Sequence, residues 1–346
     1  MSENVQNNAL DKALASLLDR RRARNQLRHL TTVPDGTVDF SSNDYLSLSS
    51  QPAVQQAFLA RLQQAVSPNP ADSSTRPLSL LGSGGSRLLD GNSPFAESLE
   101  CMLADFHGAQ AGLLFNSAMD ANVGLFSCVP QLGDVIVHDG LIHASVHDGM
   151  RLSRASRRIP FAHSHVWTAP ETALSLAAPP TERSLEAVLK ALLQGSEGTQ
   201  FSSGERNVFI AVEGVYSMDG DVAPLAEIVE CVERYLPQGN GYIIVDEAHS
   251  AGIFGDRGRG LVSELGLEGR VWARVLGFGK AIGCAGGKSF SSSPGVEEVA
   301  MLWRIMLTHA FDDRRHGTLF THNAVLSHQL RADLDLHNRH GIPFPR

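Results

Sequence analysis

The feature of this sequence that most constrains its fold is a regular alternation of short apolar runs with helical stretches after residue 93. Ser93 and Pro94 suit the N-cap and first position of a helix that should run to about His107. Runs of strand type follow at Ala111 to Phe115, Val135 to His138, Val208 to Glu213, Tyr242 to Asp246 and Val271 to Leu276. This repetition implies right-handed crossovers, so we predict an α/β fold with a doubly wound, mostly parallel sheet.

The charge and composition of the chain exclude several kinds of partner. Its 346 residues are 42% hydrophobic and 19% charged, which is typical of a globular protein. A formal net charge of -8 argues against a nucleic-acid partner, because binding a phosphate backbone needs a basic surface. We find no apolar run long enough to span a membrane, no signal-peptide core and no metal-binding cysteine pair. We therefore expect a cytoplasmic protein without a metal or a membrane partner, with a peroxisomal or mitochondrial location left open.

Side chains capable of chemistry follow the ends of two predicted strands, where ligands bind in such sheets. Asp246 ends one strand, and a buried carboxylate there needs a cation such as a protonated pyridine nitrogen. At about 4 Å and an effective dielectric near 20, that attraction is roughly 4 kcal/mol. His249, three residues on, could contact the same ring. Lys280 follows the next strand, and its amine could form a Schiff base once desolvation deprotonates it.

Three turns could complete such a site. Ser117, Ala118 and Met119 lie in a strand-to-helix turn whose backbone amides could hold a phosphate at a helix amino terminus. His143 stands at another predicted helix start, where its ring could stack on an aromatic ligand. Ser217 lies in a polar turn after a strand and could donate a hydrogen bond.

Taken in order, these segments resemble the α-oxoamine synthases, a family of pyridoxal-phosphate enzymes. The resemblance covers about Leu18 to Gly287. It is carried by SSNDYLSLS (41–49), LGSGGSRLLDGNSPFAESLE (81–100), IHASVHDG (142–149), EGVYSMDGDVAPL (213–225), VDEAHSAGIFGDRGRG (245–260) and GFGKAIG (277–283). It implies the large domain of the fold-type I pyridoxal-phosphate transferases.

The resemblance implies a role for each of these residues toward pyridoxal 5'-phosphate. Lys280 would hold the cofactor and act as catalytic base, with Asp246 on the pyridine nitrogen. His249 and Ser217 would contact the oxygens of the cofactor. His143 would stack on the ring as a second catalytic residue, and the turn from Ser117 would bind the phosphate.

The resemblance also implies a reaction and an assembly. Such enzymes are homodimers with the active site at the subunit interface, and the GSGGSR segment (82–87) would lie near it. The implied reaction is a decarboxylating condensation of an amino acid, here L-alanine, with an acyl-CoA such as pimeloyl-CoA. Arg28 matches an arginine that contacts the substrate in this family.

The chain departs from the family pattern at three places. Ala118 and Met119 stand where the family has a glycine and an aromatic residue, and Gly277 replaces a phosphate-binding threonine. A hydrogen bond to a charged group is worth about 1.5 to 3 kcal/mol, so we expect cofactor affinity to be lowered roughly ten- to a hundredfold. After Gly287 we find no resemblance to the family.

These observations divide the chain into three parts. We expect an amino-terminal helix and arm (1–45), with the helix from Leu10 to about Arg28, a cofactor-binding large domain (46–287) and a partly helical or disordered tail (288–346). Apolar spacing in the tail is compatible with two amphipathic helices. A shifted reading frame or altered splicing could produce such a tail, in which the usual small domain is missing or replaced.

Two functions follow from this division. The chain is either an active synthase or a catalytically inactive homologue that binds the cofactor or a full-length partner. The sequence argues against a third function, that of a nucleoside triphosphatase. Although residues 246–249 spell DEAH and 287–289 resemble the end of a phosphate-binding loop, their order and spacing are wrong for that class.

Overall fold

The computed structural model describes residues 8–66, 83–87, 89–168, 182–284 and 286–291. The chain divides into two units, Met1–Ser42 and Asn43–Arg346. This division lies three residues before the boundary that we expected after residue 45. The physical reason is Tyr45, whose hydroxyl lies 2.7 Å from Nδ1 of His249 and belongs with the second unit. The predicted tail from residue 292 onward, with its two helices, lies outside the described residues.

The first unit contains the predicted amino-terminal helix, α1 (Ala9–Ala23). Its N-cap, Asn8, accepts a hydrogen bond from the backbone N–H of Asp11 at 2.9 Å. The helix ends earlier than we predicted, because Asn25 adopts a left-handed φ of 53°. The backbone N–H of Gln26 then bonds to the carbonyl of Arg21, which is the Schellman arrangement that closes a helix.

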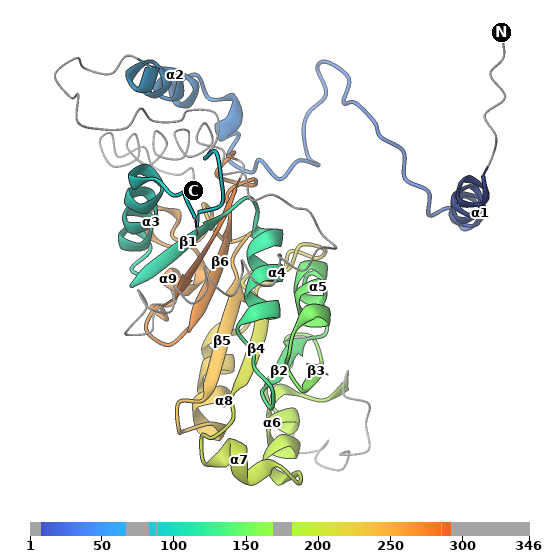
Figure 1. Cartoon of the computed structure of the whole chain (residues 1–346), viewed down its shortest axis with the longest axis vertical. Helices are drawn as coiled ribbons and strands as arrows, with labels where there is room; N and C mark the ends of the chain where they lie inside the picture. Colours follow the sequence, from blue (N-terminus) through green and yellow to red (C-terminus); the bar gives the residue numbers. More distant parts are fainter. Residues whose placement is uncertain (1–7, 67–82, 88, 169–181, 285, 292–346) are drawn as a thin grey trace. The chain divides into compact units, whose positions relative to one another are not determined.

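The second unit is built on a seven-stranded sheet with the order β1-β7-β6-β5-β4-β2-β3 (Figure 1). β7 runs antiparallel to both of its neighbours, and the other strand pairs are parallel. The prediction of a mostly parallel sheet is therefore confirmed. The strands are β1 (Ala111–Phe115), β2 (Val135–Asp139), β3 (Arg157–Phe161), β4 (Val208–Glu213), β5 (Gly241–Asp246), β6 (Ala273–Gly277) and β7 (Gly287–Ser291).

Sequence patterns missed β3 and β7 because neither strand is an apolar run. β3 reads RRIPF and lies at the edge of the sheet, where a proline is tolerated. β7 reads GKSFS, yet all five residues are buried between β1 and β6. The sheet therefore continues through Ser291, four residues past the expected end of the large domain at residue 287. The GKS sequence is part of this strand and not of a phosphate-binding loop.

Helices cover both faces of the sheet (Figure 1). Successive residues of β4 alternate between two apolar cores: Val208 and Ile210 pack with α6 and α8, whereas Phe209 and Ala211 pack with α4 and α5. The described helices are η1 (Leu48–Ser50), α2 (Pro52–Val66), α3 (Pro94–Phe106), α4 (Ala118–Cys128), α5 (Ala144–Leu152), α6 (Leu185–Gln194), α7 (Gly198–Ser202), α8 (Leu225–Tyr235), η4 (Asp256–Gly258) and α9 (Leu261–Glu264). None of those in the described part combines the length and apolar character needed to cross a membrane.

Helix α3 forms as its sequence predicts. The Ser93 side chain accepts a hydrogen bond from the backbone N–H of Ala96 at 3.2 Å, and Pro94 occupies the first turn. The helix ends at Phe106, with His107 as its C-cap.

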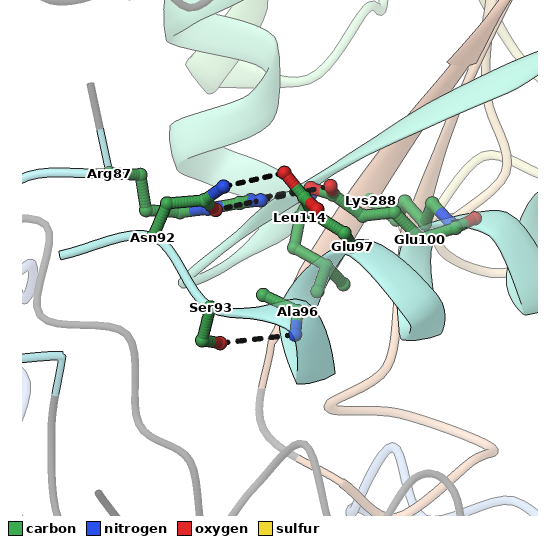
Figure 2. A network of polar contacts seen from close by, with 8 residues as sticks. All are labelled: Arg87, Asn92, Ser93, Ala96, Glu97, Glu100, Leu114 and Lys288. Atoms are coloured by element: carbon green, nitrogen blue, oxygen red, sulfur yellow. Dashed lines mark hydrogen bonds and ion pairs between the residues drawn. The ribbon is translucent and has the colours of Figure 1, made fainter. Parts of the chain in front are cut away.

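A polar network fastens the glycine-rich segment before α3 to the antiparallel side of the sheet (Figure 2). Arg87 donates to both carboxylate oxygens of Glu100, at 2.5 and 3.0 Å, and Glu100 also accepts from the backbone N–H of Leu114. From β7, the Lys288 amine donates to the Glu100 carbonyl. A side chain at Gly112 would overlap the Lys288 stem. Burial lowers the pKa of Lys288 to about 7, which further marks this as an enclosed site.

Candidate active site

The carboxyl ends of three neighbouring strands bring the candidate residues to one edge of the sheet. β4, β5 and β6 lie side by side and end at Glu213, Asp246 and Gly277. The register pairs Glu213 directly with Asp246. The amino termini of α4 and α5 follow β1 and β2, so they add Ser117 and His143 as helix N-caps. This is the edge at which doubly wound sheets bind their ligands.

Lys280 ends a line of hydrogen bonds that runs through His249. Its Nζ lies 2.7 Å from Nε2 of His249, and Nδ1 of that ring lies 2.7 Å from the Tyr45 hydroxyl. Tyr45 in turn donates to Oδ1 of Asn43 at 3.1 Å. A protonated amine has only hydrogens to offer, so Nε2 accepts from Lys280 and Nδ1 donates to Tyr45.

Burial disfavours the charged forms of Lys280 and His249. Desolvation lowers the pKa of Lys280, and the charges of Asp246 and Glu213 oppose that shift. Burial, aided by the Lys280 charge, lowers the pKa of His249 to about 4. His249 is therefore an uncharged hydrogen-bonding group at neutral pH, and the Lys280 amine loses its proton more readily than a solvated lysine does.

Asp246 is the buried carboxylate of the site, and two donors hold it. Its Oδ1 accepts from the backbone N–H of Ala248 at 2.9 Å, and its Oδ2 accepts from the Asn122 amide at 2.6 Å. The same Asn122 nitrogen donates to the hydroxyl of Ser145 at 3.0 Å. Nδ1 of His143 lies 2.7 Å from that hydroxyl, so Asn122 and Ser145 join Asp246 to His143.

Glu213 is a second buried carboxyl group beside Asp246. Burial, followed by the Asp246 charge, raises the pKa of Glu213 to about 8, although Lys280 and the backbone N–H of His143 lower it in part. Like charges this close disfavour joint ionisation, so Glu213 is mainly protonated at neutral pH.

This shift predicts a pH-dependent contribution to stability. The folded-state pKa of Glu213 lies above its ordinary value of 4.5, so between about pH 4.5 and 8 the folded chain binds a proton that the unfolded chain has lost. Its contribution to stability therefore falls as pH rises through that window. Glu213→Gln cannot ionise at this position. We therefore expect its free energy of unfolding, relative to that of the unaltered chain, to rise by up to about 1.4 kcal/mol per pH unit. Urea unfolding from pH 5 to 8 measures this.

The exposed Glu227 provides the matched control. The difference in free energy of unfolding between Glu227→Gln and the unaltered chain should stay the same at every pH. A constant difference between Glu213→Gln and the unaltered chain across the window would show that Glu213 keeps an ordinary pKa.

The predicted phosphate turn forms at the start of α4. The hydroxyl of Ser117 accepts from the backbone N–H of Asp120 at 3.0 Å and donates to the Asp120 carboxylate at 2.9 Å. A Cβ at Gly277 would lie 3.4 Å from the Ala118 Cβ and 3.0 Å from that of Ala248. A side chain at position 277 would therefore touch Ala118 and press on Ala248.

Three of the predicted residues are exposed. Ser217 lies exposed at the tip of a turn, and no hydrogen bond joins it to Lys280 or Asp246 in the described part of the chain. Met119 is 51% exposed. Arg28 is an exposed residue of the first unit. The roles of Ser217, Met119 and Arg28 stay predictions.

Sequence reasoning missed Tyr45, Asn122, Ser145 and Glu213. Glu213 carried the same signal as Asp246, because it is a carboxylate at the end of an apolar strand. The other three are polar residues whose partners are distant in sequence, and no local pattern indicated them. The described residues contain no group of three or more His, Cys, Asp or Glu side chains able to hold a metal ion.

The sheet has the fold of the large domain of the fold-type I pyridoxal-phosphate transferases. The comparison with protein families agrees, since the model for aminotransferase class I and II matches residues 35–338. The chain belongs to this family. The matched segment extends past Gly287, where sequence patterns gave no resemblance.

Curated proteins with two different names are similar to the chain. The chain is 53% identical over 277 residues to 8-amino-7-oxononanoate synthase from Emericella nidulans, an alignment covering 80% of this chain and 60% of that protein. It is 37% identical over 277 residues to the aminoacyl transferase sphA from Aspergillus fumigatus, covering 79% and 53% of the two chains. The chain thus spans little more than half the length of the curated relatives it matches.

Solved structures agree on the fold. A serine palmitoyltransferase from S. paucimobilis aligns with a TM-score of 0.67 at 24% identity, covering 96% of this chain and 76% of the other. An 8-amino-7-oxononanoate synthase from Francisella tularensis aligns with a TM-score of 0.59 at 22% identity, covering 89% and 71%.

Proposed function

We propose that this chain is a pyridoxal-phosphate-dependent acyltransferase of the α-oxoamine synthase type. It would condense an amino acid with an acyl-CoA and release CO2 and CoA. The observation that carries the proposal is the placement of Lys280 against His249 beside the buried Asp246, at the carboxyl edge of β5 and β6. The 53% identical relative supports the same reaction class.

The residues present fit the cofactor. Asp246 is 6% exposed, and both of its oxygens accept hydrogen bonds, so it is a fixed anion suited to a protonated pyridine nitrogen. Ser117 caps α4, whose first backbone amides suit a phosphate. Pyridoxal phosphate, when bound, supplies an electron sink for the bonding electrons released at the α-carbon of the amino acid.

Each side chain would then have a defined task. The Lys280 amine would hold the cofactor and move the proton of the amino acid's α-carbon. Asp246 would keep a proton on the ring nitrogen, with Asn122 fixing the orientation of its carboxylate. His249 would contact the cofactor's phenolic oxygen, and the exposed ring of His143 would stack on the cofactor.

For the substrates, we propose L-alanine and pimeloyl-CoA, giving 8-amino-7-oxononanoate for biotin synthesis. The support is the name of the 53% identical relative, together with the bacterial 8-amino-7-oxononanoate synthases that are 32–34% identical. We propose a homodimer for the active form, with Arg28 contacting the substrate.

The second candidate is a chain that binds the cofactor without catalysis or pairs with a full-length relative. The observation that favours it is the span of the match, which covers 60% of the Emericella nidulans synthase. Its expected signature is a bound cofactor with no turnover.

The test is to purify the chain with pyridoxal phosphate, add L-alanine and pimeloyl-CoA, and follow the free thiol of released CoA. Parallel reactions with L-serine and palmitoyl-CoA test the alternative that the structural neighbours suggest. CoA release with the first pair supports the synthase, and release with the second pair alone overturns the proposed substrates. A bound cofactor with no release from either pair favours the second candidate.

A further inference from the structure

An aspartate–histidine–aspartate bridge lies outside the residues assigned above. Nδ1 of His163 lies 2.8 Å from Oδ1 of Asp139, and its Nε2 lies 2.8 Å from Oδ2 of Asp221. Asp139 is the last residue of β2, His163 follows β3, and Asp221 belongs to the turn after β4. The bridge therefore joins the ends of three strands at the edge of the sheet that holds the candidate active site.

The geometry favours a positively charged His163. A carboxylate only accepts hydrogen bonds, so a ring with a carboxylate oxygen on each nitrogen must donate from both. Burial lowers the pKa of His163, but the hydrogen bonds and charges of Asp139 and Asp221 outweigh burial and raise it above the ordinary value. The titratable groups facing the ring are these two carboxylates and Tyr216.

The Asp139 carboxylate at one end of this bridge is held in place by burial and by further hydrogen bonds. It is fully buried, and it also accepts from the backbone N–H groups of Leu141 and Ser164, each at 2.8 Å. Ser164 adopts a left-handed φ of 53° beside His163. This conformation is uncommon for a residue with a side chain and indicates that the surrounding contacts fix the backbone here.

The other end of the bridge holds the turn that carries Ser217. The backbone N–H of Tyr216 bonds to the Asp221 carbonyl, and that of Gly220 bonds to the Tyr216 carbonyl, each at 2.9 Å. Below the turn, Val215 and Val222 form a single isolated bridge. The Tyr216 ring packs edge-on against His163, with centroids 4.5 Å apart. His163 thus contacts both ends of a short turn whose tip is exposed.

We propose that His163 is a positioning residue, whose imidazolium holds the Tyr216–Asp221 turn so that the Ser217 hydroxyl faces the cofactor oxygen. The inference rests on the proposed function and deepens it. A solvent-exposed serine at the tip of a turn would otherwise lose conformational entropy on binding a ligand. The charged bridge beneath the turn fixes the turn's conformation before the ligand binds, so less entropy is lost on binding.

The first test measures the turn without any cofactor. Hydrogen exchange followed by mass spectrometry should show that His163→Ala lowers the protection of the amides of residues 216–222 at least tenfold, while the amides of β5 keep theirs. In the unaltered chain, protection of this turn relative to β5 should fall as pH rises through the raised pKa of His163. The exposed His165, two residues away, supplies the control variant His165→Ala. Unchanged protection of the turn in His163→Ala overturns the proposal.

The second test is a double-mutant cycle on pyridoxal-phosphate affinity, measured by absorbance titration. We expect Ser217→Ala and His163→Ala each to lower cofactor affinity about ten- to a hundredfold. The affinity of the double variant should equal that of the single variant with the larger loss. Multiplication of the two effects would mean that His163 acts only on general stability, and this would overturn the inference. If the unaltered chain binds no cofactor while the turn loses protection in His163→Ala, the proposed function fails and the cofactor-directed role fails with it.

Discussion

Replacing Lys280 by alanine should abolish covalent attachment of the cofactor and lower CoA release by about a thousandfold or more. The amine is the group that would bond to the cofactor, and the described part of the site contains no second lysine. The buried Lys288 of β7 donates a hydrogen bond to the backbone carbonyl of Glu100 in α3. Borohydride reduction of the loaded protein, followed by peptide mass mapping, should find the modification on Lys280 in the unaltered chain and nowhere in the variant.

The matched control for this experiment is Lys190→Ala. Lys190 is an exposed lysine of α6, and its ion-pair partner Glu186 keeps hydrogen bonds from the Tyr235 hydroxyl and the backbone N–H of Thr168. This variant should keep the modification and the turnover of the unaltered chain. A reduced adduct on Lys190 or Lys288, with Lys280 unmodified, would contradict the proposed site.

Replacing Asp246 by asparagine should lower turnover by about a thousandfold while leaving the fold intact. The carboxylate's attraction for a protonated ring nitrogen is roughly 4 kcal/mol, and a neutral amide loses most of it. The substitution fits sterically. Oδ1 of Asn122 has no partner among the described residues, so a rotated Asn122 amide could accept a hydrogen bond from the new asparagine.

The measurements are CoA release, cofactor affinity and thermal unfolding. The control is Asp256→Asn, an exposed carboxylate in η4 that should behave like the unaltered chain. Equal turnover in Asp246→Asn and the unaltered chain would remove the carboxylate from the mechanism. A large fall in melting temperature would instead indicate that Asp246 serves the fold.

The strands that sequence patterns predicted correctly are those whose burial follows from local composition. β4 is buried on both faces and contains five apolar residues before Glu213, so its position was evident. β7 is equally buried but contains one lysine, two serines and one glycine. Its burial depends on the Glu100 carbonyl and on the space above Gly112, and these are tertiary features that a short window of sequence does not contain.

The candidate site shows the same division between local and tertiary information. The strand-end positions of Asp246 and the helix-cap positions of Ser117 and His143 follow from local patterns, and the structure places them at one edge of the sheet. The contact between Tyr45 and His249 joins residues 204 positions apart, and that between Asn122 and Asp246 joins residues 124 apart. Such pairings depend on the crossovers of the whole sheet, so they emerge only from the three-dimensional fold.

The position of β7 also has a consequence for how the chain assembles during synthesis. Among the described strands, β1 pairs with β7 alone, although β1 is the earliest in the chain and β7 the latest. A nascent chain that has emerged as far as β6 therefore holds β1 with no hydrogen-bonding neighbour and leaves one side of β6 open to other strands. Completion of the sheet waits for pairing between residues as distant in sequence as Ala111 and Ser291, and pairings of such large sequence separation form slowly. Until then the half-made sheet is the state in which this protein is most open to aggregation or to capture by a chaperone.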